Sequence, residues 1–287
     1  MKTIVAIGEV LWDMLPAGRQ VGGAPGNFAF HAQALGARAR IISRVGNDLL
    51  GRELLEFYRR HDLSTDFITI DPSAPTGTVG VEIIDGQPCY TIFENVAWDR
   101  IEPETSALEL LHSADALCFG SLLCRTESAR NALLAMIAAS PEKSLRVLDI
   151  NLRPPFYSKQ QLLPLLEAAN VFKLNDDELK ILSAMFACPE TTEERQVRWF
   201  LERYDFQLIA LTRGAHGSLL MSSDATASVP GQKVHVVDTV GAGDAFTAQI
   251  VIGFLAGLPL EEIIRRADEL AAFVCTRPGA LHRHQTV

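Results

Sequence analysis

The sequence lacks the features of a secreted or membrane-bound protein. Its five cysteines are an odd number, lie far apart and form no CxxC pair, which indicates buried thiols in a reducing cytoplasm. No apolar run reaches the length of a membrane span without a charge or a glycine, and residues 1–8 resemble a short strand rather than a signal peptide. We therefore expect a cytoplasmic protein that has no membrane partner.

Positive charge and the common nucleotide-binding motifs are also scarce. The 26 lysines and arginines against 35 acidic residues give a net charge of −9, which argues against nucleic acid as a partner. The chain holds no G-x-x-x-x-G-K-[ST] phosphate loop, no kinase-type G-x-G-x-x-G before a lysine strand, no dinucleotide fingerprint and no histidine–cysteine cluster at metal spacing. An anionic ligand would have to be held by local features, since the overall charge opposes it.

Composition and the order of the predicted elements favour one large α/β unit. Hydrophobic residues make up 48% of the 287 residues, enough for a sizeable core. We expect strands near residues 2–8, 40–45, 115–119, 145–151, 170–174 and 207–212, and helices near 28–35, 48–60, 127–139, 159–168, 193–204 and 260–275. This alternation predicts a mostly parallel sheet covered on both faces, in a single Rossmann-like domain of three layers (α/β/α) over residues 1–287.

Residues 66–99 have a different pattern. Apolar and polar residues alternate there with period two, and Asp85-Gly86 is typical of a hairpin turn. The pattern predicts an antiparallel sheet with one solvated face, packed beside the main body. Together with residues 10–24 it could form a small β-sheet lid, through which two copies of the chain could pair as a homodimer.

The segment around residue 240 is the strongest candidate for chemistry. A β-type run over 234–237 ends at Asp238, the turn Gly241-Ala242-Gly243 follows, and a buried helix is expected over 245–258. Backbone N–H groups and the positive end of the dipole make a helix N-terminus an anion site, and Asp244 adds a carboxylate beside it. This pairing suits a phosphoryl group that meets a hydroxyl. The alternative is an aspartate that only complements the helix dipole, worth ~0.3–1 kcal/mol.

Several motifs, spread over essentially the whole length, resemble those of the ribokinase-like sugar kinases. They are Gly22-Gly23-Ala24-Pro25-Gly26-Asn27, Leu35-Gly36, Val45-Gly46-Asn47-Asp48-x-x-Gly51, Asn175-x-x-Glu178, Thr212-Arg213-Gly214-x-x-Gly217 and the highly specific Asp238–Phe246. Glu94–Asp99 and Asp149-x-Asn151-x-Arg153-Pro154 resemble the fructokinase branch. Two departures from the family pattern are Gly26, where alanine is more frequent, and Arg283, where a small polar residue is frequent.

The resemblance implies an enzyme that transfers the γ-phosphoryl group of ATP to the primary hydroxyl of a sugar, with Mg²⁺ and K⁺ as ions. The fructokinase-like motifs favour fructose, phosphorylated to fructose 6-phosphate. One alternative is the same chemistry on ribose or on a sugar acid such as 2-keto-3-deoxygluconate. Another, of a different class, is a sugar- or nucleotide-binding protein without catalysis, against which the intact Asp244 and glycines argue.

The resemblance also implies roles for the turn and its aspartate. Asp244 would be the base that takes the proton of the sugar hydroxyl, and Gly241, Ala242 and Gly243 would donate backbone N–H groups to the phosphoryl group. Because a helix N-terminus favours the ionised carboxylate, we expect Asp244 to be a weak base until ATP brings negative charge beside it.

The sugar-binding positions that the resemblance implies are Asp13, Gly22, Gly23, Asn27, Trp98 and Arg153. An acidic side chain such as Asp13 can accept from two hydroxyls, Trp98 could cover a sugar ring, and Arg153 could reach a sugar or phosphate oxygen. The residues alone leave plainer alternatives open: a turn at Asp13, packing of the lid or of a partner subunit at Trp98, and a surface side chain at Arg153.

The nucleotide-binding positions implied in the same way are Asn175, Glu178, Thr212, Gly214 and Gly217. Asn175 and Glu178 would handle Mg²⁺ and phosphate, largely through water. A helix-capping box and an ordinary turn explain the same residues without a ligand. The implied potassium site consists of Asp238, Val240, Val274, Arg277 and Gly279, next to the Gly241-Ala242-Gly243 turn.

Overall fold

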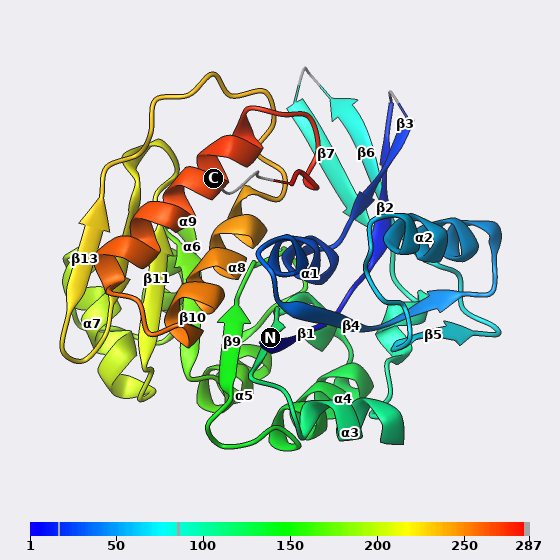
Figure 1. The fold of residues 1–287 in the computed structure, drawn as a ribbon, viewed down its shortest axis with the longest axis horizontal. Helices are drawn as coiled ribbons and strands as arrows, with labels where there is room; N and C mark the ends of the chain where they lie inside the picture. Colours follow the sequence, from blue (N-terminus) through cyan, green and yellow to red (C-terminus); the bar gives the residue numbers. More distant parts are fainter. Residues whose placement is uncertain (17, 85–86, 284–287) are drawn as a thin grey trace.

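The chain folds into two β-sheets, the larger of which is surrounded by helices (Figure 1). The computed structural model describes residues 1–16, 18–84 and 87–283. Within these residues the larger sheet has nine strands in the order β13-β12-β11-β10-β9-β8-β1-β4-β5, and the smaller has four in the order β3-β2-β6-β7. The predicted α/β class, with a mostly parallel sheet and a small sheet beside it, is confirmed. The hairpin turn predicted at Asp85-Gly86 lies outside the described residues.

Most of the larger sheet is parallel, as the alternation of elements predicted. Its parallel strands are β1 (Thr3–Ile7), β4 (Arg38–Gly46), β5 (Ile68–Asp71), β8 (Ala116–Phe119), β9 (Leu145–Asp149), β10 (Val171–Asn175) and β11 (Leu208–Thr212). At one edge, β12 (Ser218–Met221) and β13 (Thr226–Val229) add antiparallel pairs. Crossover connections carry the helices to the two faces of such a sheet.

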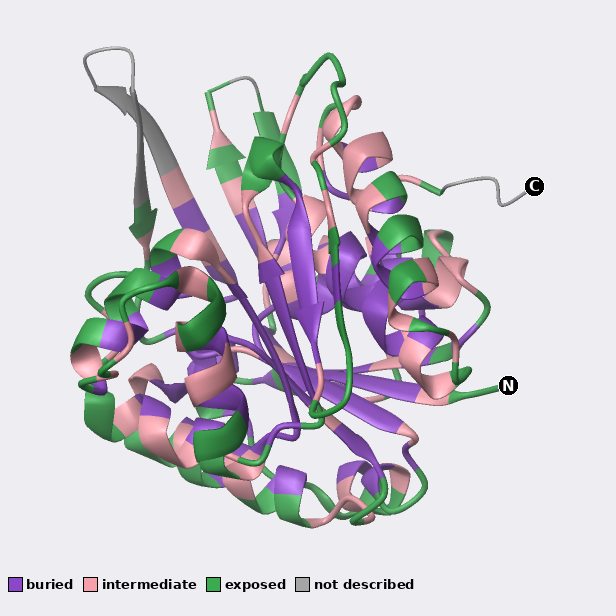
Figure 2. Cartoon of the chain, turned by 90° about the vertical axis from the view of Figure 1, so that its left-hand side faces the viewer, coloured by how far each residue is buried: buried purple, intermediate pink, exposed green. Residues whose placement is uncertain are grey.

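Helices cover both faces of the larger sheet. One face packs against α1 (Ala24–Ala34), α2 (Leu49–Arg60), α8 (Ala242–Leu255) and α9 (Leu260–Cys275). The other packs against α3 (Thr105–Leu111), α4 (Glu127–Ala138), α5 (Lys159–Ala168), α6 (Asp176–Met185) and α7 (Glu193–Arg203). In strand β1, Ile4 and Ala6 enter the first core, whereas Val5 and Ile7 enter the second, so four consecutive residues are apolar and buried. Figure 2 shows that the strands at the centre of the molecule consist largely of buried residues. No helix in the described ranges is long and apolar enough to cross a bilayer.

The smaller sheet consists of β2 (Leu11–Leu15), β3 (Gly18–Gly22), β6 (Gly77–Ile84) and β7 (Gln87–Ile92) and projects from the main body (Figure 1). One detail of the predicted lid is wrong. The expected strand near 66–71 is β5, which pairs parallel with β4 in the larger sheet, whereas β6 and β7 pair antiparallel as expected. The cause is that a half-buried edge strand alternates with period two whichever sheet it joins. A lid function and a homodimer through this sheet stay predictions.

The β-type run over 234–237 forms no strand. Strand β13 ends at Val229, and the valines at 234, 236 and 237 are 36%, 54% and 53% exposed. The backbone N–H groups of Val237 and Asp238 donate to the carbonyl oxygen of Cys275 at the end of α9, over 2.8 and 3.3 Å. Alternation of apolar residues predicted a strand, but the segment is fixed by a helix end instead of a strand partner.

Trp98 packs inside the core, which favours the plainer of the two expectations for this side chain. The side chain is 1% exposed and belongs to the core beneath the larger sheet. The guanidinium of Arg125 lies 3.9 Å from its ring centroid and donates to both carboxylate oxygens of Asp99, over 2.6 and 2.7 Å. Arg125 also donates to the carbonyl oxygen of Phe93, just after β7. The Glu94–Asp99 motif therefore joins the smaller sheet to the main body.

Candidate active site

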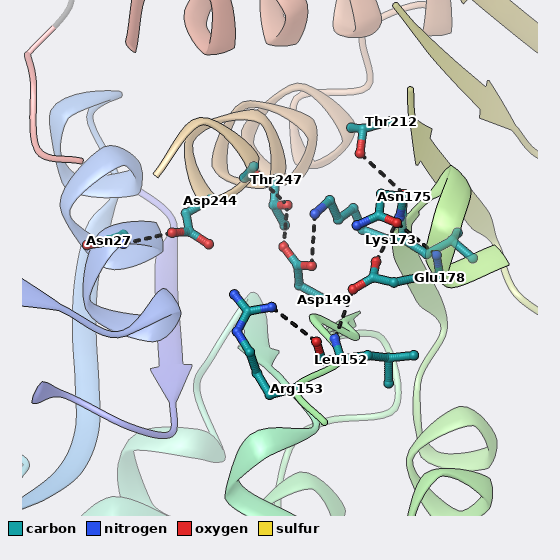
Figure 3. Close-up of polar contacts among 12 residues, drawn as sticks. Asn27, Asp149, Leu152, Arg153, Lys173, Asn175, Glu178, Thr212, Asp244 and Thr247 are labelled. Carbon is teal, nitrogen blue, oxygen red and sulfur yellow. Dashed lines mark hydrogen bonds and ion pairs between the residues drawn. The ribbon is translucent and has the colours of Figure 1, made fainter. Parts of the chain in front are cut away.

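Polar residues gather at the carboxyl ends of the parallel strands. Glu9 lies two residues after β1, and Asp149, Asn175 and Thr212 end β9, β10 and β11. The strand order reverses between β1 and β8, because the chain proceeds to β4 and β5 on one side and to β9, β10 and β11 on the other. Ligands of such sheets bind outside the carboxyl ends near this reversal. The fold thus brings together residues far apart in the sequence (Figure 3).

The turn Gly241-Ala242-Gly243, called the anion turn below, is the start of α8. Gly241 is the N-cap, with a φ of 78°, and a Cβ there would overlap Ala280, so only glycine fits. Gly243 has no positive φ; a Cβ there would lie 3.2 Å from Nζ of Lys173. Because α8 begins at Ala242, its first N–H groups lack intrahelical acceptors: that of Ala242 donates to the carbonyl oxygen of Thr239 over 3.3 Å, whereas those of Gly243 and Asp244 could bind an anion.

Asp244 lies in the first turn of α8 and is held by helix α1. Nδ2 of Asn27 donates to its Oδ2 over 2.8 Å. Burial raises the pKa of Asp244 to about 6 and the charge of Asp149 adds to this, whereas the Asn27 hydrogen bond and the charges of Lys173 and Arg153 lower it. The expectation of a weak base is contradicted, because desolvation outweighs the helix dipole. A carboxylate in this pKa range suits general-base chemistry near neutral pH.

The remaining sugar-binding candidates meet where β2, β3 and the start of α1 come together. A Cβ at Gly22 would overlap the carboxylate of Asp13, so this glycine makes room for that side chain. Burial raises the pKa of Asp13 to about 6, against the opposing charge of Arg153. Gly23 is the N-cap of α1, with a φ of 101°. Oδ1 of Asn27 is buried and has no partner in the part of the chain that the structure describes, so a ligand hydroxyl could donate to it.

Arg153 belongs to the same group of residues, although it is a surface side chain. It lies in the segment after β9, and Figure 3 shows its guanidinium directed toward Asp244. Its positive charge lowers the pKa values of Glu9, Asp13 and Asp244, which come from three different elements. One of its N–H groups donates to the carbonyl oxygen of Leu152 over 3.1 Å. The other donors could reach an oxygen-rich ligand.

Three residues of this region were missed by the sequence analysis. Glu9 is 5% exposed, and burial raises its pKa to about 7. Lys173 is buried in β10 and pairs with Asp149, and Thr247 of α8 donates to the same carboxylate over 2.8 Å. A signal existed for Glu9 and Lys173, because a charged residue in or directly after an apolar strand needs a partner or a function. Thr247 gave no signal, since a threonine inside an apolar helix matches no motif.

The predicted nucleotide residues occupy the ends of β10 and β11. Asn175 and Glu178 form the helix cap, each side chain accepting from the other's backbone N–H over 2.8 Å, and Glu178 also accepts from the N–H of Leu152. Thr212 ends β11, and Gly214 is exposed with a φ of 51°. Gly217 is buried, and a Cβ there would overlap the carbonyl of Val229, so strand packing accounts for this glycine. The described residues contain no cluster of three or more His, Cys, Asp or Glu that could hold a metal directly.

Among the predicted potassium residues, the carboxylate of Asp238 connects Val240 and Gly279. Asp238 accepts from the N–H of Val240 over 3.1 Å and from the N–H of Gly279 over 2.8 Å. The carbonyl of Val274 lies in the last turn of α9 and accepts from the N–H of Arg277 over 3.0 Å. Arg283 lies apart from this group, since it pairs with Asp62 beyond the end of α2.

A hollow of about 450 Å³ lies elsewhere, at the amino ends of β1 and β4. Arg38, Arg40 and Arg59 are among its lining residues, and none of the candidate site residues is. The candidate site is therefore defined by its side chains and not by this hollow.

The fold and the site point to a class of protein: a carboxylate lies in the first turn of a helix whose N-terminal N–H groups could bind an anion, an arrangement that suits phosphoryl transfer to a hydroxyl. The model of the pfkB family carbohydrate kinases matches residues 16–286, and the chain belongs to this family. It is a phosphotransferase that acts on a sugar hydroxyl.

Relatives of known name and structure resemble the chain over nearly its whole length. Fructokinase-2 of Zea mays is 28% identical over 313 residues, which cover 99% of this chain and 91% of that protein. An uncharacterized sugar kinase from Pyrococcus horikoshii, solved in complex with ATP, is 27% identical with a TM-score of 0.80 and covers 96% of this chain and 93% of its own. The fructokinase of Xylella fastidiosa with bound ATP, at 23% identity and a TM-score of 0.85, covers 97% of this chain and 94% of its own and shows the shared fold.

We expect Asp244→Asn to remove the base and keep the fold. The amide can still accept from Asn27, so binding of ATP should stay within a few-fold, while kcat should fall at least ~10², the lower end for a positioned acid–base group. In the unmodified protein kcat/KM should fall as the pH drops through about 6, because the base becomes protonated. Asp177→Asn is the matched control, since Asp177 is an exposed first-turn aspartate of α6. Turnover of Asp244→Asn close to that of the control would refute the assignment.

Proposed function

We propose that the protein transfers the γ-phosphoryl group of ATP to the primary hydroxyl of a ketohexose, with fructose as the preferred substrate. The observation that carries the proposal is the hydrogen bond between Asn27 and Asp244. This bond connects α1, which would bind the sugar, to Asp244 at the start of α8, which would act as the base. A sugar hydroxyl bound beside Asn27 would lie next to both Asp244 and the N–H groups of the anion turn.

In the proposed reaction Asp244 accepts the proton of the sugar hydroxyl as the sugar oxygen attacks the γ-phosphorus. The bond from that phosphorus to the β-phosphate oxygen breaks, and ADP leaves with this oxygen. The N–H groups of the anion turn stabilise the charge on the transferring oxygens. Positioning and charge stabilisation carry most of such a reaction, because its transition state is loose.

ATP would arrive with Mg²⁺, which neutralises phosphate charge during transfer. Both carboxylate oxygens of Glu178 already accept backbone N–H groups, from Leu152 and Asn175. We therefore propose that Asn175 and Glu178 act on the magnesium and the phosphates through water, which suits the reluctance of Mg²⁺ to lose its hydration shell. Thr212 and Gly214, at the end of the neighbouring strand, would contact the nucleotide phosphates.

The preference for fructose is supported by the named relatives and by the chemistry of the candidate sugar-binding residues. The relatives from rice and maize, at 27% and 28% identity, are both named fructokinase-2. Asp13 and Oδ1 of Asn27 are acceptors, which suit the hydroxyls of a neutral polyol. The nearest alternative is a sugar acid, whose carboxylate would find a partner in Arg153.

In a panel of fructose, tagatose, ribose, glucose and 2-keto-3-deoxygluconate, we expect fructose to give the highest kcat/KM in a coupled assay of ADP release. Asp13→Ala should lower this value about ten- to a hundred-fold, mainly through the KM for the sugar, because a hydroxyl bonded to a charged group is worth ~1.5–3 kcal/mol. The KM for ATP serves as the internal control and should change little.

A clear preference for the sugar acid would make the ketohexose assignment wrong and would point to Arg153 as the partner of its carboxylate. If none of the sugars released ADP above background, the chain would be a binding protein rather than a kinase for this substrate class.

We also propose that K⁺ binds beside the anion turn, at Asp238 and the backbone of Val240, Val274, Arg277 and Gly279. The support is the pair of hydrogen bonds by which Asp238 connects Val240 to Gly279. A monovalent cation there would add a positive charge next to the anion turn and would fix the orientation of the backbone beside it.

Replacing K⁺ by Na⁺ or by a Tris-only buffer should lower kcat, and EDTA should abolish turnover by removing Mg²⁺. Asp238→Asn should reduce the response to K⁺, whereas Asp224→Asn, on an exposed turn between β12 and β13, should retain it. Equal rates in all monovalent salts would contradict the potassium proposal and leave the kinase proposal intact.

A further inference from the structure

Lys173 is the buried cation of the site, and neither the motifs nor the proposed reaction uses it. It lies in β10 among apolar neighbours and is 8% exposed. Its Nζ is 3.0 Å from Oδ1 of Asp149 at the end of the adjacent strand β9. A buried ion pair is weak evidence for stability, because desolvation of the two charges can exceed their attraction. Stability alone therefore does not explain why this ion pair is buried here.

The ammonium group of Lys173 stands against the anion turn. A Cβ on Gly243 would lie 3.2 Å from Nζ, the nearest atom outside the turn itself, so the glycine leaves room for this charge. The hydroxyl of Thr247 lies 2.8 Å from Oδ2 of Asp149, one helical turn after Gly243. Asp149 thus connects Lys173 to α8 (Figure 3), and its ion pair holds the ammonium beside Gly243.

Three carboxylates act on the ammonium group of Lys173. Asp149, Glu178 and Asp244 all act on its pKa and raise it, so the ammonium stays charged despite its burial. Of its three N–H donors, one goes to Asp149 within the described ranges. The part of the chain that the structure describes records no acceptor for the other two donors, so they could donate to a phosphate bound at the anion turn.

We propose that Lys173 is a catalytic residue that donates hydrogen bonds to the transferring phosphoryl group, while Asp149 and Thr247 are positioning residues that hold its ammonium against the anion turn. The proposal rests on the placement of that group at the anion turn, but not on which sugar is the acceptor. Lys173 remains protonated throughout: the hydroxyl proton goes to Asp244, the phosphoryl group passes to the sugar oxygen, and ADP keeps the bridging oxygen. A fixed cation of this kind stabilises the charge of the transition state without reorganisation.

The test is a double-mutant cycle on Lys173 and Asp149. Lys173→Met alone would leave a carboxylate buried without its partner, and so it would lower both the melting temperature and the activity for two reasons at once. Asp149→Asn combined with Lys173→Met removes both charges and should restore the melting temperature. Asp149→Asn alone keeps the ammonium. Lys173→Arg keeps the positive charge with a different shape.

We expect the double variant to fold normally and still lose ~10²–10³ in kcat, the loss typical of removing one donor to a transition-state oxyanion, with the KM for the sugar within about three-fold. Asp149→Asn alone should lose at most about ten-fold, and Lys173→Arg should recover part of kcat. A double variant with kcat close to the unmodified protein would overturn the proposal, because Lys173 would then be only the counter-ion of Asp149. Asp149→Asn as inactive as the double variant would overturn it as well.

The activity of the unmodified protein shows whether a failure concerns the proposed function or only the role of Lys173. If it turns over no sugar, the proposed function fails before the cycle is measured. If it is active and the double variant is equally active, only the role of Lys173 fails. The melting temperature of each variant shows whether a loss of activity reflects a loss of fold.

Discussion

The hydrogen bond from Asn27 to Asp244 joins residues 217 positions apart, and the rest of the site depends on it. It connects the first turns of α1 and α8, which pack on the same face of the larger sheet. Two helix N-termini, each begun by a glycine of positive φ, thus meet around one carboxylate. In the smaller sheet, Gly22 and Asp13 lie against each other just before the N-cap of α1. On the parallel strands, Asp149 and Lys173 form an ion pair whose charges act on the pKa of Asp244.

The same arrangement places acidic groups where water is scarce, and this has a consequence for stability. Burial raises the pKa of Glu9 to about 7 and those of Asp13 and Asp244 to about 6. Because these values lie above the ordinary ones of 4.5 and 3.8, the folded protein binds these protons more tightly than the unfolded chain does. Their contribution to the free energy of unfolding is present below about pH 4 and is lost as the pH rises through 6 to 7. At neutral pH the site therefore lowers stability in exchange for a usable base, a common feature of active sites.

Local patterns in the sequence predicted the α/β class, most strands of the larger sheet, the cap at Asn175 and Glu178, and the anion turn, because each depends on neighbouring residues. Features that depend on residues distant in the sequence could not be predicted from local patterns. The alternation near residue 68 did not reveal which sheet β5 joins, and the valines near 236 gave no sign that a helix end would hold them. Trp98 matched a motif, but it packs in the core with Arg125 over its ring, which the sequence did not reveal. The pKa of Asp244 followed from burial rather than from its place in a helix, and the pairing of Lys173 with Asp149 needed the strand order.

The central claim is that burial beside α1 makes Asp244 a proton acceptor near neutral pH. It is tested most directly by following the carboxyl ¹³C resonance of Asp244 by NMR during a pH titration of the ligand-free protein. We predict a midpoint at about 6, and a higher midpoint in Asn27→Ala, because the Asn27 hydrogen bond lowers the pKa. A midpoint near the ordinary value of 3.8 that does not respond to the loss of Asn27 would contradict the account.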